Sequence, residues 1–501
     1  MPKEEKYLRR TAKGGTMIFC GTVIGGLVSI LLHILLSRTL GARQYGLYTL
    51  GFSVFLVAHS ILSLGLQRGI LRYVSVHYGM KDVKRTKGTL LFSLAVGAAT
   101  NVVGGTIIYV FADKIAAGIF NEVEFAAVIR FFAITLPFYD ILMLCCSGIR
   151  GFQKIFAFTL FRNVLQPIVN ITMVTALFLL TEPNLRMVLY AYLATILIIA
   201  TVTVGYLRHI FPDLISNLEP IIEAQIMMRY SIPLLFVGIA YILLSSVDRI
   251  MIGYYCAPED VGIYSVAAKV AIQIKVVLTC INTTIAPIIA DLDNRGRKSE
   301  IALLFKTSTR WIVTLVLPMV LICVLFGGNL VGLFGMDFLE GRRILIILSF
   351  AYLIAAGTGS VGVILNMTGR QDIEMVNTFF MLVLNIVLNV WLIGAYGVVG
   401  AAIATGFSIG LTNIAKLVEV RILLGFQPYD RKYIKPIFVT VGIFALGLFC
   451  INRITSGGSL WFFGACAVVF VYIGALFLFG IEKEDKVILE AVKKKLYIKR
   501  F

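Results

Sequence analysis

Fourteen long apolar segments, each ended by glycine, proline or charged residues, constrain this chain more than any other feature. Each can cross the hydrocarbon core of a bilayer, which takes about 20 apolar residues in a helix. Of the 501 residues, 59% are apolar and 14% are charged, a balance that no soluble domain requires. The segments lie at about residues 14–36, 46–66, 88–111, 126–149, 157–181, 185–207, 230–252, 261–289, 301–326, 343–366, 373–395, 397–420, 434–452 and 459–480. The sequence therefore predicts an all-α, polytopic membrane protein with 14 transmembrane helices.

The distribution of lysine and arginine predicts the orientation of these helices. With the N-terminus in the cytoplasm, about three quarters of the 45 basic residues fall on the cytoplasmic side, as the positive-inside rule requires. We therefore expect a multi-pass protein of the plasma (inner) membrane with both termini cytoplasmic. The net charge of +18 then reflects topology and contact with anionic membrane lipids, so we expect no nucleic-acid partner.

The chain repeats itself at an offset of about 216 residues, which corresponds to half of a transporter. The segment LGARQYGLYTL, with Gly46 and Tyr48, is matched by CAPEDVGIYSV, with Gly262 and Tyr264. Three further pairs keep the same order: Gly118 with Gly332, Gly151 with Gly369, and Asn170 with Asn389. Six spans in each half predict two parallel six-helix repeats, followed by two appended C-terminal helices.

This repeat predicts the domain organisation. We expect an N-terminal six-helix bundle at 1–207, a cytoplasmic linker at 208–229, a C-terminal six-helix bundle at 230–433, transmembrane helices 13 and 14 at 434–480, and a basic cytoplasmic tail at 481–501. The linker is amphipathic, which favours either a helix along the membrane surface or a plain tether. The predicted outside loops are too short to hold catalytic groups, so we expect a protein that is not an enzyme.

Ionisable residues inside apolar spans are costly and therefore indicate candidate functional sites. Lys275 is the strongest candidate because it lies near the middle of its span, whereas Lys269 can extend to the interface. The complete candidate substrate-binding set is Lys275, Lys269, Arg249, Asp248, Arg38, His33, His59, Gln273 and Asn282. A structural role is the alternative for each residue: Asp248 can pair with Arg249, and the histidines can be helix contacts.

For other polar residues within or beside the spans, a role in substrate binding and a structural role are again the two alternatives. Arg68 and Arg72 lie at the cytoplasmic mouth of the second span, where a solvated helix end competes with capture of an anionic substrate. Asp140 is embedded in the fourth span. We expect no metal site or cofactor, since the eight cysteines form no CxxC motif, but His33 and His59 leave coupling to H⁺ or Na⁺ open.

Three motifs resemble those of a known family. They are RTLGARQYGLY after the first span, APEDVGIYSVAAK after the seventh and LFGMDFLEGRRIL before the tenth. They are similar to the oligosaccharide flippases, the Wzx-like polysaccharide biosynthesis proteins of the multidrug/oligosaccharidyl-lipid/polysaccharide exporter superfamily. The resemblance implies a V-shaped pair of bundles around a cavity lined by spans 1, 2, 7 and 8. It also implies alternating access, which moves a polyprenyl-(di)phosphate-linked oligosaccharide to the outer leaflet for surface polysaccharide or glycan assembly.

On this resemblance, basic residues in the cavity neutralise the lipid phosphate. Lys269, Lys275 and Arg249 match that role by position, whereas His33 and His59 stand where the lipid II flippases have arginine. We therefore expect the anionic end of the substrate against the C-terminal half.

The resemblance also implies the partners of this protein. Besides the lipid-linked oligosaccharide and membrane lipids, they include glycan polymerase or ligase machinery as candidates, around a monomeric transporter. The alternative is a cation-coupled multidrug exporter, for which the candidate spans offer one carboxylate, Asp248.

Overall fold

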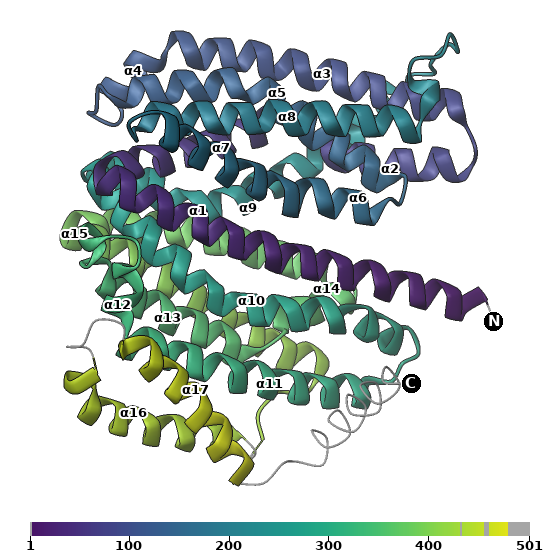
Figure 1. Ribbon diagram of the computed structural model, residues 1–501. Coiled ribbons are helices and arrows are strands. Elements are labelled where there is room, and N and C mark those ends of the chain that lie inside the picture. Colours follow the sequence, from purple (N-terminus) through teal and green to yellow (C-terminus); the bar gives the residue numbers. More distant parts are fainter. Residues whose placement is uncertain (1–2, 431–432, 455–459, 479–501) are drawn as a thin grey trace, which may run out of the picture. The chain divides into compact units, whose positions relative to one another are not determined.

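The computed structural model of the chain describes residues 3–430, 433–454 and 460–478 (Figure 1). All regular secondary structure in these residues is helical, which confirms the predicted all-α class. The helices are α1 (Lys3–Leu62), α2 (Leu66–Gly79), α3 (Val83–Val110), α4 (Ala112–Gly118), α5 (Phe125–Gly151), α6 (Ile155–Thr159), η1 (Leu160–Leu165), α7 (Gln166–Leu180), α8 (Leu185–Ile210), η2 (Pro212–Leu214), α9 (Ala224–Tyr255), α10 (Pro258–Asn294), α11 (Lys298–Leu325), α12 (Gly327–Gly332), η3 (Met336–Phe338), α13 (Gly341–Thr358), α14 (Val361–Met367), α15 (Gln371–Leu424), α16 (Ile434–Ile454) and α17 (Leu460–Leu478). The predicted tail at 481–501 lies outside the described residues.

Ten of the described helices are long and apolar enough to cross a membrane, which confirms a multi-pass membrane protein. Two of them, α1 with 60 residues and α15 with 54 residues, are longer than one crossing needs. A glycine with non-helical backbone angles interrupts each, Gly41 (φ 70°) in α1 and Gly397 (φ 57°) in α15. These glycines lie at the predicted boundaries between spans 1 and 2 and between spans 11 and 12. The total of 14 spans stays a prediction.

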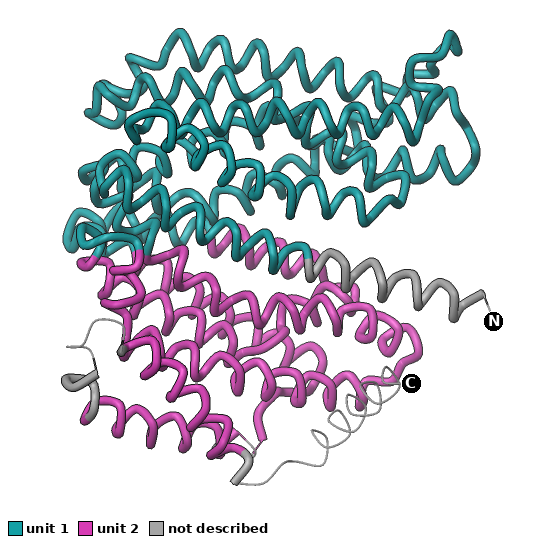
Figure 2. Tube along the Cα trace, viewed as in Figure 1, with its two compact units in different colours: residues 1–266, 334–338, 382–401 teal, residues 267–333, 339–381, 402–501 magenta. Residues whose placement is uncertain are grey.

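The chain forms two compact units, coloured separately in Figure 2. The first contains residues 1–266, 334–338 and 382–401, and the second contains residues 267–333, 339–381 and 402–501. Helices α1 to α9 and the start of α10 thus belong to the first unit. The bundle boundaries expected near 207 and 230 stay a prediction.

The first unit is built on α3, α5 and α8, which pack side by side (Figure 1). Helix α1 packs against α5, α7 and α9. Where α1, α5 and α8 meet, the ring of Phe132 lies 5.2 Å from that of Phe55 and 6.0 Å from that of Tyr192, measured between centroids. Tilted and edge-on aromatic contacts of this kind favour one packing arrangement over others. They hold α1 against the α5 and α8 pair that borders the candidate site.

The two copies of the repeated motif contact each other within the first unit. Ser265 Oγ donates to Thr49 Oγ1 at 3.1 Å, and Arg43 Nη1 donates to Glu259 Oε1 at 3.3 Å. Both pairs are 216 residues apart in the chain. Each contact therefore joins equivalent positions of the two copies, which supports the predicted repeat.

The backbones of the two copies also approach each other reciprocally. A Cβ atom on Gly46 would lie 1.8 Å from the carbonyl oxygen of Pro258, and a Cβ atom on Gly262 would lie 2.4 Å from that of Ala42. Exchange of equivalent partners is what a two-fold relation between two segments produces. Glycine is needed at both motif positions because any side chain would push the copies apart. We call this contact the repeat seam.

In the second unit, α11 packs against α13, α16 and α17. Apolar side chains of α11, α16 and α17 form one core, which includes Val313, Leu317, Leu321, Leu325, Val439, Ile443, Val468 and Tyr472. A further cluster joins α10, α11 and α14 around Phe305. The appended helices α16 and α17 are therefore an integral part of this unit.

The linker predicted at 208–229 has no α-helix of its own. Between α8 and α9 only the short 3-10 helix η2 is present. Lys87 of α3, which is 5% exposed, donates to the backbone carbonyls of Ser216 at 2.6 Å and Leu218 at 2.9 Å. The surface-helix alternative is therefore wrong, and the linker is a tether fixed to α3.

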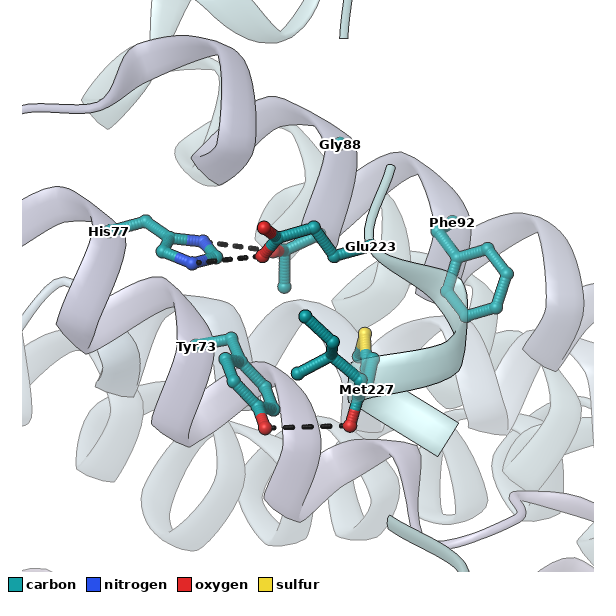
Figure 3. A pocket seen from close by; sticks show the side chains of 8 residues that line it. Tyr73, His77, Gly88, Phe92, Glu223 and Met227 are labelled. Atoms are coloured by element: carbon teal, nitrogen blue, oxygen red, sulfur yellow. Dashed lines mark hydrogen bonds and ion pairs between the residues drawn. The ribbon is translucent and has the colours of Figure 1, made fainter. Parts of the chain in front are cut away.

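Figure 3 shows where the end of this linker is held against α2 and α3. Glu223 Oε2 lies 3.4 Å from His77 Nε2, and Glu223 Oε1 lies 3.2 Å from Arg85 Nε. The Tyr73 hydroxyl donates to the carbonyl of Ile226 at 3.5 Å. The hollow between these side chains measures about 10 Å³, enough for about one water molecule. We therefore regard it as part of the linker attachment and not as a substrate site.

Candidate functional site

The first unit contains a cavity of about 280 Å³ whose wall is formed by α1, α2, α5, η1 and α9. Its polar lining residues are His59, Ser60, Ser63, Gln67, Arg68, Tyr139, Arg162 and Tyr241. The remaining wall is apolar and includes Leu56, Met143, Leu234 and Ile242. A largely apolar concavity with a few polar groups has the composition of a ligand site.

Arg68 reaches this cavity because the chain breaks just before it. The predicted second span, 46–66, is interrupted between α1 and α2, where Leu64 (φ 49°) and Gly65 (φ 69°) have left-handed backbone angles. A Cβ atom on Gly65 would lie 2.3 Å from the carbonyl oxygen of Ser231 in α9. Gly65 is therefore required by its backbone angle and by the close approach of α9. The break places Arg68 in the first turn of α2.

Arg162 reaches the cavity from η1, which is a π-helix. Pro167 has no N–H to donate to the carbonyl of Asn163, so the regular α-helical hydrogen bond is lost at this point. Gly25 of α1 allows close packing here, because a Cβ atom on it would lie 1.7 Å from the Asn163 oxygen. Single π turns inside helices often occur at functional sites. The Arg162 guanidinium lies 5.9 Å from the Phe158 ring centroid and completes the cavity wall.

The cavity wall carries positive charge without a matching carboxylate. Among the described residues, Arg68 and Arg162 have no acidic partner within ion-pair distance, and no aspartate or glutamate lines the cavity. Guanidinium groups bind phosphate well because their donors form a planar fork. No cluster of three or more His, Cys, Asp or Glu residues in the described part of the chain could hold a metal ion. The two unpaired guanidinium groups therefore suit an anionic group.

Five of the predicted site residues lie in the first unit. His59 lines the cavity. His33 Nδ1 lies 3.0 Å from the Tyr45 hydroxyl, and Arg38 is exposed. Arg249 donates to a backbone carbonyl one turn earlier in α9, at 3.1 Å. Of these residues, the structure brings His59 together with Arg68 and leaves the other three away from the cavity lining.

Asp248, the fifth residue, lies in a buried polar cluster. Its carboxylate accepts a hydrogen bond from the Tyr264 hydroxyl at 2.6 Å and one from the Asn389 amide at 2.9 Å. Asn389 also donates to the amide oxygen of Asn385 at 3.1 Å. All four residues are at most 9% exposed. These contacts satisfy a carboxylate that would otherwise be costly to bury.

The other four predicted residues lie on α10 in the second unit. Lys275 is exposed at the surface of this unit, and Lys269 is half-buried. The Gln273 amide donates to the backbone carbonyl of Lys269 at 3.1 Å. The amide oxygen of Asn282 is buried without a hydrogen-bond partner in the described part of the chain. The substrate role of these four residues stays a prediction.

Arg162 was not among the residues that the sequence singled out. It had one visible signal: it is a basic residue inside the apolar segment 157–181 and lies five positions before Pro167. A proline inside a predicted span indicates a local break, and a charge beside such a break is a candidate site residue.

The described residues form a multi-pass helical fold with a positively charged cavity in the first unit. The model of the family described as "Polysaccharide biosynthesis protein" matches residues 11–293, more than half of the chain, so the chain belongs to that family. The MatE family model matches residues 233–391. The protein is thus a flippase-like transporter of the multidrug/oligosaccharidyl-lipid/polysaccharide exporter superfamily.

Two of three curated relatives are named as probable flippases. An uncharacterized membrane protein of Methanocaldococcus jannaschii is 22% identical, over 95% of this chain and 96% of that protein. The "Probable flippase AglR" of Haloferax volcanii is 28% identical over 41% of this chain and 44% of its own length. The "Probable low-salt glycan biosynthesis flippase Agl15" of the same organism is 26% identical over 34% of this chain and 36% of its own length.

Solved structures share the fold at low sequence identity. The lipid II flippase MurJ in an inward closed conformation has a TM-score of 0.71 at 12% identity, covering 93% of this chain and 98% of that one. An inward-facing MATE multidrug resistance transporter has a TM-score of 0.65 at 15% identity, covering 80% and 94% of the two chains. These neighbours are transporters and flippases and not enzymes, and at such identity they show the fold alone.

Proposed function

We propose that this protein flips a polyprenyl-(di)phosphate-linked oligosaccharide from the cytoplasmic to the outer leaflet by alternating access, for surface polysaccharide or glycan assembly. The observation that carries the proposal is the cavity in the first unit, where Arg68 and Arg162 are unpaired with carboxylates. A charged side chain within a membrane protein is costly and is kept where a function needs it. Two such cations facing one cavity favour a substrate with a phosphate or diphosphate group. The proposal therefore puts the anionic end in the first unit, whereas the sequence alone led us to expect it against the C-terminal half.

The other lining groups suit the junction between phosphate and sugar. Ser60, Gln67 and Tyr241 offer hydroxyl and amide groups for sugar hydroxyls, and Tyr139 offers an aromatic face. The cavity volume of about 280 Å³ accommodates the phosphate and at most a small part of the glycan. The rest of the oligosaccharide and the polyprenyl chain must therefore lie outside it.

The orientation of the protein follows from the charge distribution and belongs to the same proposal. Arg68 lies at the end of the second predicted span that the positive-inside rule assigns to the cytoplasm. A plasma-membrane protein with both termini cytoplasmic would thus load its anionic head group from the cytoplasmic leaflet. The relatives named as probable flippases support a flippase role.

The alternative is a cation-coupled multidrug exporter, and the MatE match and the MATE-like fold support it. A cavity for cationic drugs needs carboxylates, because a positive wall repels such ligands. Here the described cavity is lined by Arg68 and Arg162 and by no carboxylate. The charge of the cavity therefore favours the flippase over the exporter.

Deletion and complementation test the proposal. In a deletion strain we expect the glycan to remain attached to its lipid carrier on the inner leaflet, and the wild-type gene to restore surface glycan. The Arg68→Ala/Arg162→Ala variant should lower transport by about tenfold to a hundredfold, which corresponds to the loss of charge-assisted hydrogen bonds of about 1.5–3 kcal/mol. Arg130→Ala is the matched control, because Arg130 pairs with Asp113 outside the cavity. Normal surface glycan in the deletion strain, or normal export by the double variant, would contradict the proposal.

The same strain tests the lysines of α10. We propose that Lys275 and Lys269 also contact the substrate, and we expect Lys275→Ala and Lys269→Ala to reduce surface glycan. Lys298→Ala, at an exposed position near the start of α11, is the control. Full complementation by both alanine variants would remove these lysines from the site while leaving the role of the cavity intact.

The proposal includes a monomeric transporter that needs no organic cofactor and works beside glycan polymerase or ligase machinery. It also includes coupling to an H⁺ or Na⁺ gradient. Transport measured in proteoliposomes should slow when ionophores collapse both gradients. Unchanged transport under those conditions would remove ion coupling and leave the substrate assignment in place.

A further inference from the structure

A buried histidine in the cavity wall contacts a buried carboxylate behind it. His59 Nε2 is 3.1 Å from Asp140 Oδ1. His59 is 6% exposed and Asp140 is 0% exposed. The second carboxylate oxygen, Asp140 Oδ2, is buried and has no hydrogen-bond partner in the described part of the chain. A carboxylate with one unsatisfied oxygen is costly to bury, so this pair requires an explanation beyond packing.

The surrounding helices hold the pair at this position. The Tyr139 ring meets the His59 ring edge-on, with centroids 4.7 Å apart. On the opposite side, α3 presents Gly97, where a Cβ atom would lie 2.4 Å from Asp140 Oδ2. The glycine leaves room for the carboxylate and supplies no side-chain donor. His59 thus lies between the carboxylate and the cavity, whose wall it forms.

The charged and titratable groups around His59 come from every neighbouring element. The charged groups are Arg68 of α2, Arg162 of η1 and Asp140 of α5. The other titratable groups are Tyr139 and Cys146 of α5, Tyr192 of α8 and Tyr241 of α9. Asp140 is the one carboxylate in this set. A proton on the His59 imidazole is therefore opposed by two guanidinium groups and stabilised by one carboxylate.

We propose that the His59–Asp140 pair is a proton-binding site that takes up a proton when a phosphate-bearing ligand fills the cavity. The inference rests on the proposed function, because it needs an anion beside Arg68 and Arg162. The anion offsets the positive charge of the two guanidinium groups and adds attraction for an imidazolium on His59. Asp140, on the far side of the ring, stabilises that imidazolium. The ligand is therefore carried together with a proton that lowers the net negative charge inside the membrane.

Thermodynamic linkage gives the consequence for binding. If the anion favours the protonated pair, then protonation must strengthen binding of the anion by the same factor. Affinity for a ligand of constant charge should rise as the pH falls, by up to about tenfold per pH unit when one proton is taken up. At pH values where the pair is fully protonated, or fully deprotonated, in both the free and the ligand-bound protein, affinity should not change with pH.

Calorimetry tests the site with the full-length protein in detergent. The probe is geranyl diphosphate-linked N-acetylglucosamine, whose diphosphate diester stays fully ionised through the measured pH range. Titration in two buffers of different ionisation enthalpy gives the number of protons taken up with the ligand. We expect uptake of up to about one proton for the wild type and none for His59→Gln. Asp140→Asn should reduce uptake, because the imidazolium loses its counter-charge.

His209→Gln is the matched control, because His209 is exposed near the end of α8 and does not line the cavity. It should bind the probe with wild-type proton uptake. If His59→Gln does not fold, the wild-type pH profile and buffer comparison decide the matter alone. Binding with identical heats in both buffers overturns the proton site and leaves the anion site intact. Absence of binding to the wild type overturns the anion site, the proposed function and this inference together.

Discussion

The Asp248 carboxylate shows how single buried charges are accommodated in this protein. It accepts hydrogen bonds from Tyr264 and Asn389, which come from α10 and α15. Hydrogen bonds to an ionised acceptor are shorter and stronger than neutral ones, and the 2.6 Å contact with Tyr264 fits that pattern. Three helices are joined by this one group. We therefore expect its loss to affect stability before it affects substrate binding.

Tyr264→Phe tests this expectation. The variant keeps the ring but removes the hydroxyl that donates to the buried Asp248 carboxylate at 2.6 Å. We expect a loss of about 1.5–3 kcal/mol in the free energy of unfolding. The measurement is thermal or denaturant unfolding in detergent. Tyr255→Phe, at an exposed position of α9, is the control and should leave stability nearly unchanged. Equal stability of both variants would contradict the structural role of the cluster.

Cys256 lies between α9 and α10, outside the membrane-spanning helices, and its environment predicts slow thiol chemistry. Burial, with a smaller contribution from Asp260, raises the pKa of the Cys256 thiol to about 11. Since the thiolate is the reactive form, its fraction near neutral pH is small and rises about tenfold per pH unit below that pKa.

The test uses a variant in which Cys256 is the only cysteine and a membrane-impermeant maleimide. Labelling between about pH 7 and 9 should accelerate with pH throughout the range. Ala257→Cys in a cysteine-free background is the exposed control, and its rate should level off near the ordinary thiol pKa of about 8.5. Similar rates and profiles at the two positions would contradict the raised pKa.

At the scale of elements, the repeat seam depends on two glycines. Gly46 of α1 faces the first turn of α10, and Gly262 of α10 faces the turn of α1 that contains Ala42. Backbone contact at these distances replaces the side-chain packing that normally separates helix axes by 8–10 Å. The seam therefore tolerates no added atom on either side.

Gly46→Ala should destabilise the protein although alanine is the better helix former. Overpacking at the seam should cost about 1–3 kcal/mol, measured as the free energy of unfolding. Gly26→Ala is the matched control in the same helix, because nothing lies within 4 Å of the position of its added Cβ atom. The control should be stabilised by about 0.5–1 kcal/mol. A stabilised Gly46→Ala variant would show that the seam is not closely packed.

At the scale of the whole molecule, alternating access requires that the two repeats separate on one side of the membrane during each cycle. The repeat seam is closed in this structure. The hydroxyls of Thr49 and Ser265 are 3.1 Å apart, and both side chains are buried. Opening of this contact is therefore a movement that transport should need.

A disulfide across the seam tests this requirement. In a cysteine-free background, the Thr49→Cys/Ser265→Cys variant should form an intramolecular disulfide when oxidised, because the two side chains already touch. Transport in proteoliposomes should be lost on oxidation and restored by a reductant. The two single-cysteine variants are the controls and should be insensitive to both treatments. Full transport by the oxidised, cross-linked protein would show that the seam stays closed throughout the cycle.

Much of the fold was predictable because its signals are local. The hydropathy of each segment identifies membrane helices, and Gly41 and Gly397 lie where the apolar runs were expected to end. The repeat was visible because Gly46 and Gly262 are required by the same backbone contact in each copy. For the linker, the sequence left a surface helix and a tether as alternatives. Its amphipathic pattern does not reveal that Lys87 binds the backbone carbonyl of Ser216 and so fixes the linker as a tether.

The sequence by itself therefore determined the all-α membrane class and the repeated glycine motif, since apolar length and glycine positions act through nearby residues and through the membrane. Only the tertiary structure decided the cavity. Arg162 lines it from the π-helix η1, and His59 meets Asp140 across 81 residues of chain. Hydropathy marks where a helix crosses a membrane but does not set the rotation of that helix about its axis. Packing of neighbouring helices sets the rotation and hence the partners of each embedded charge.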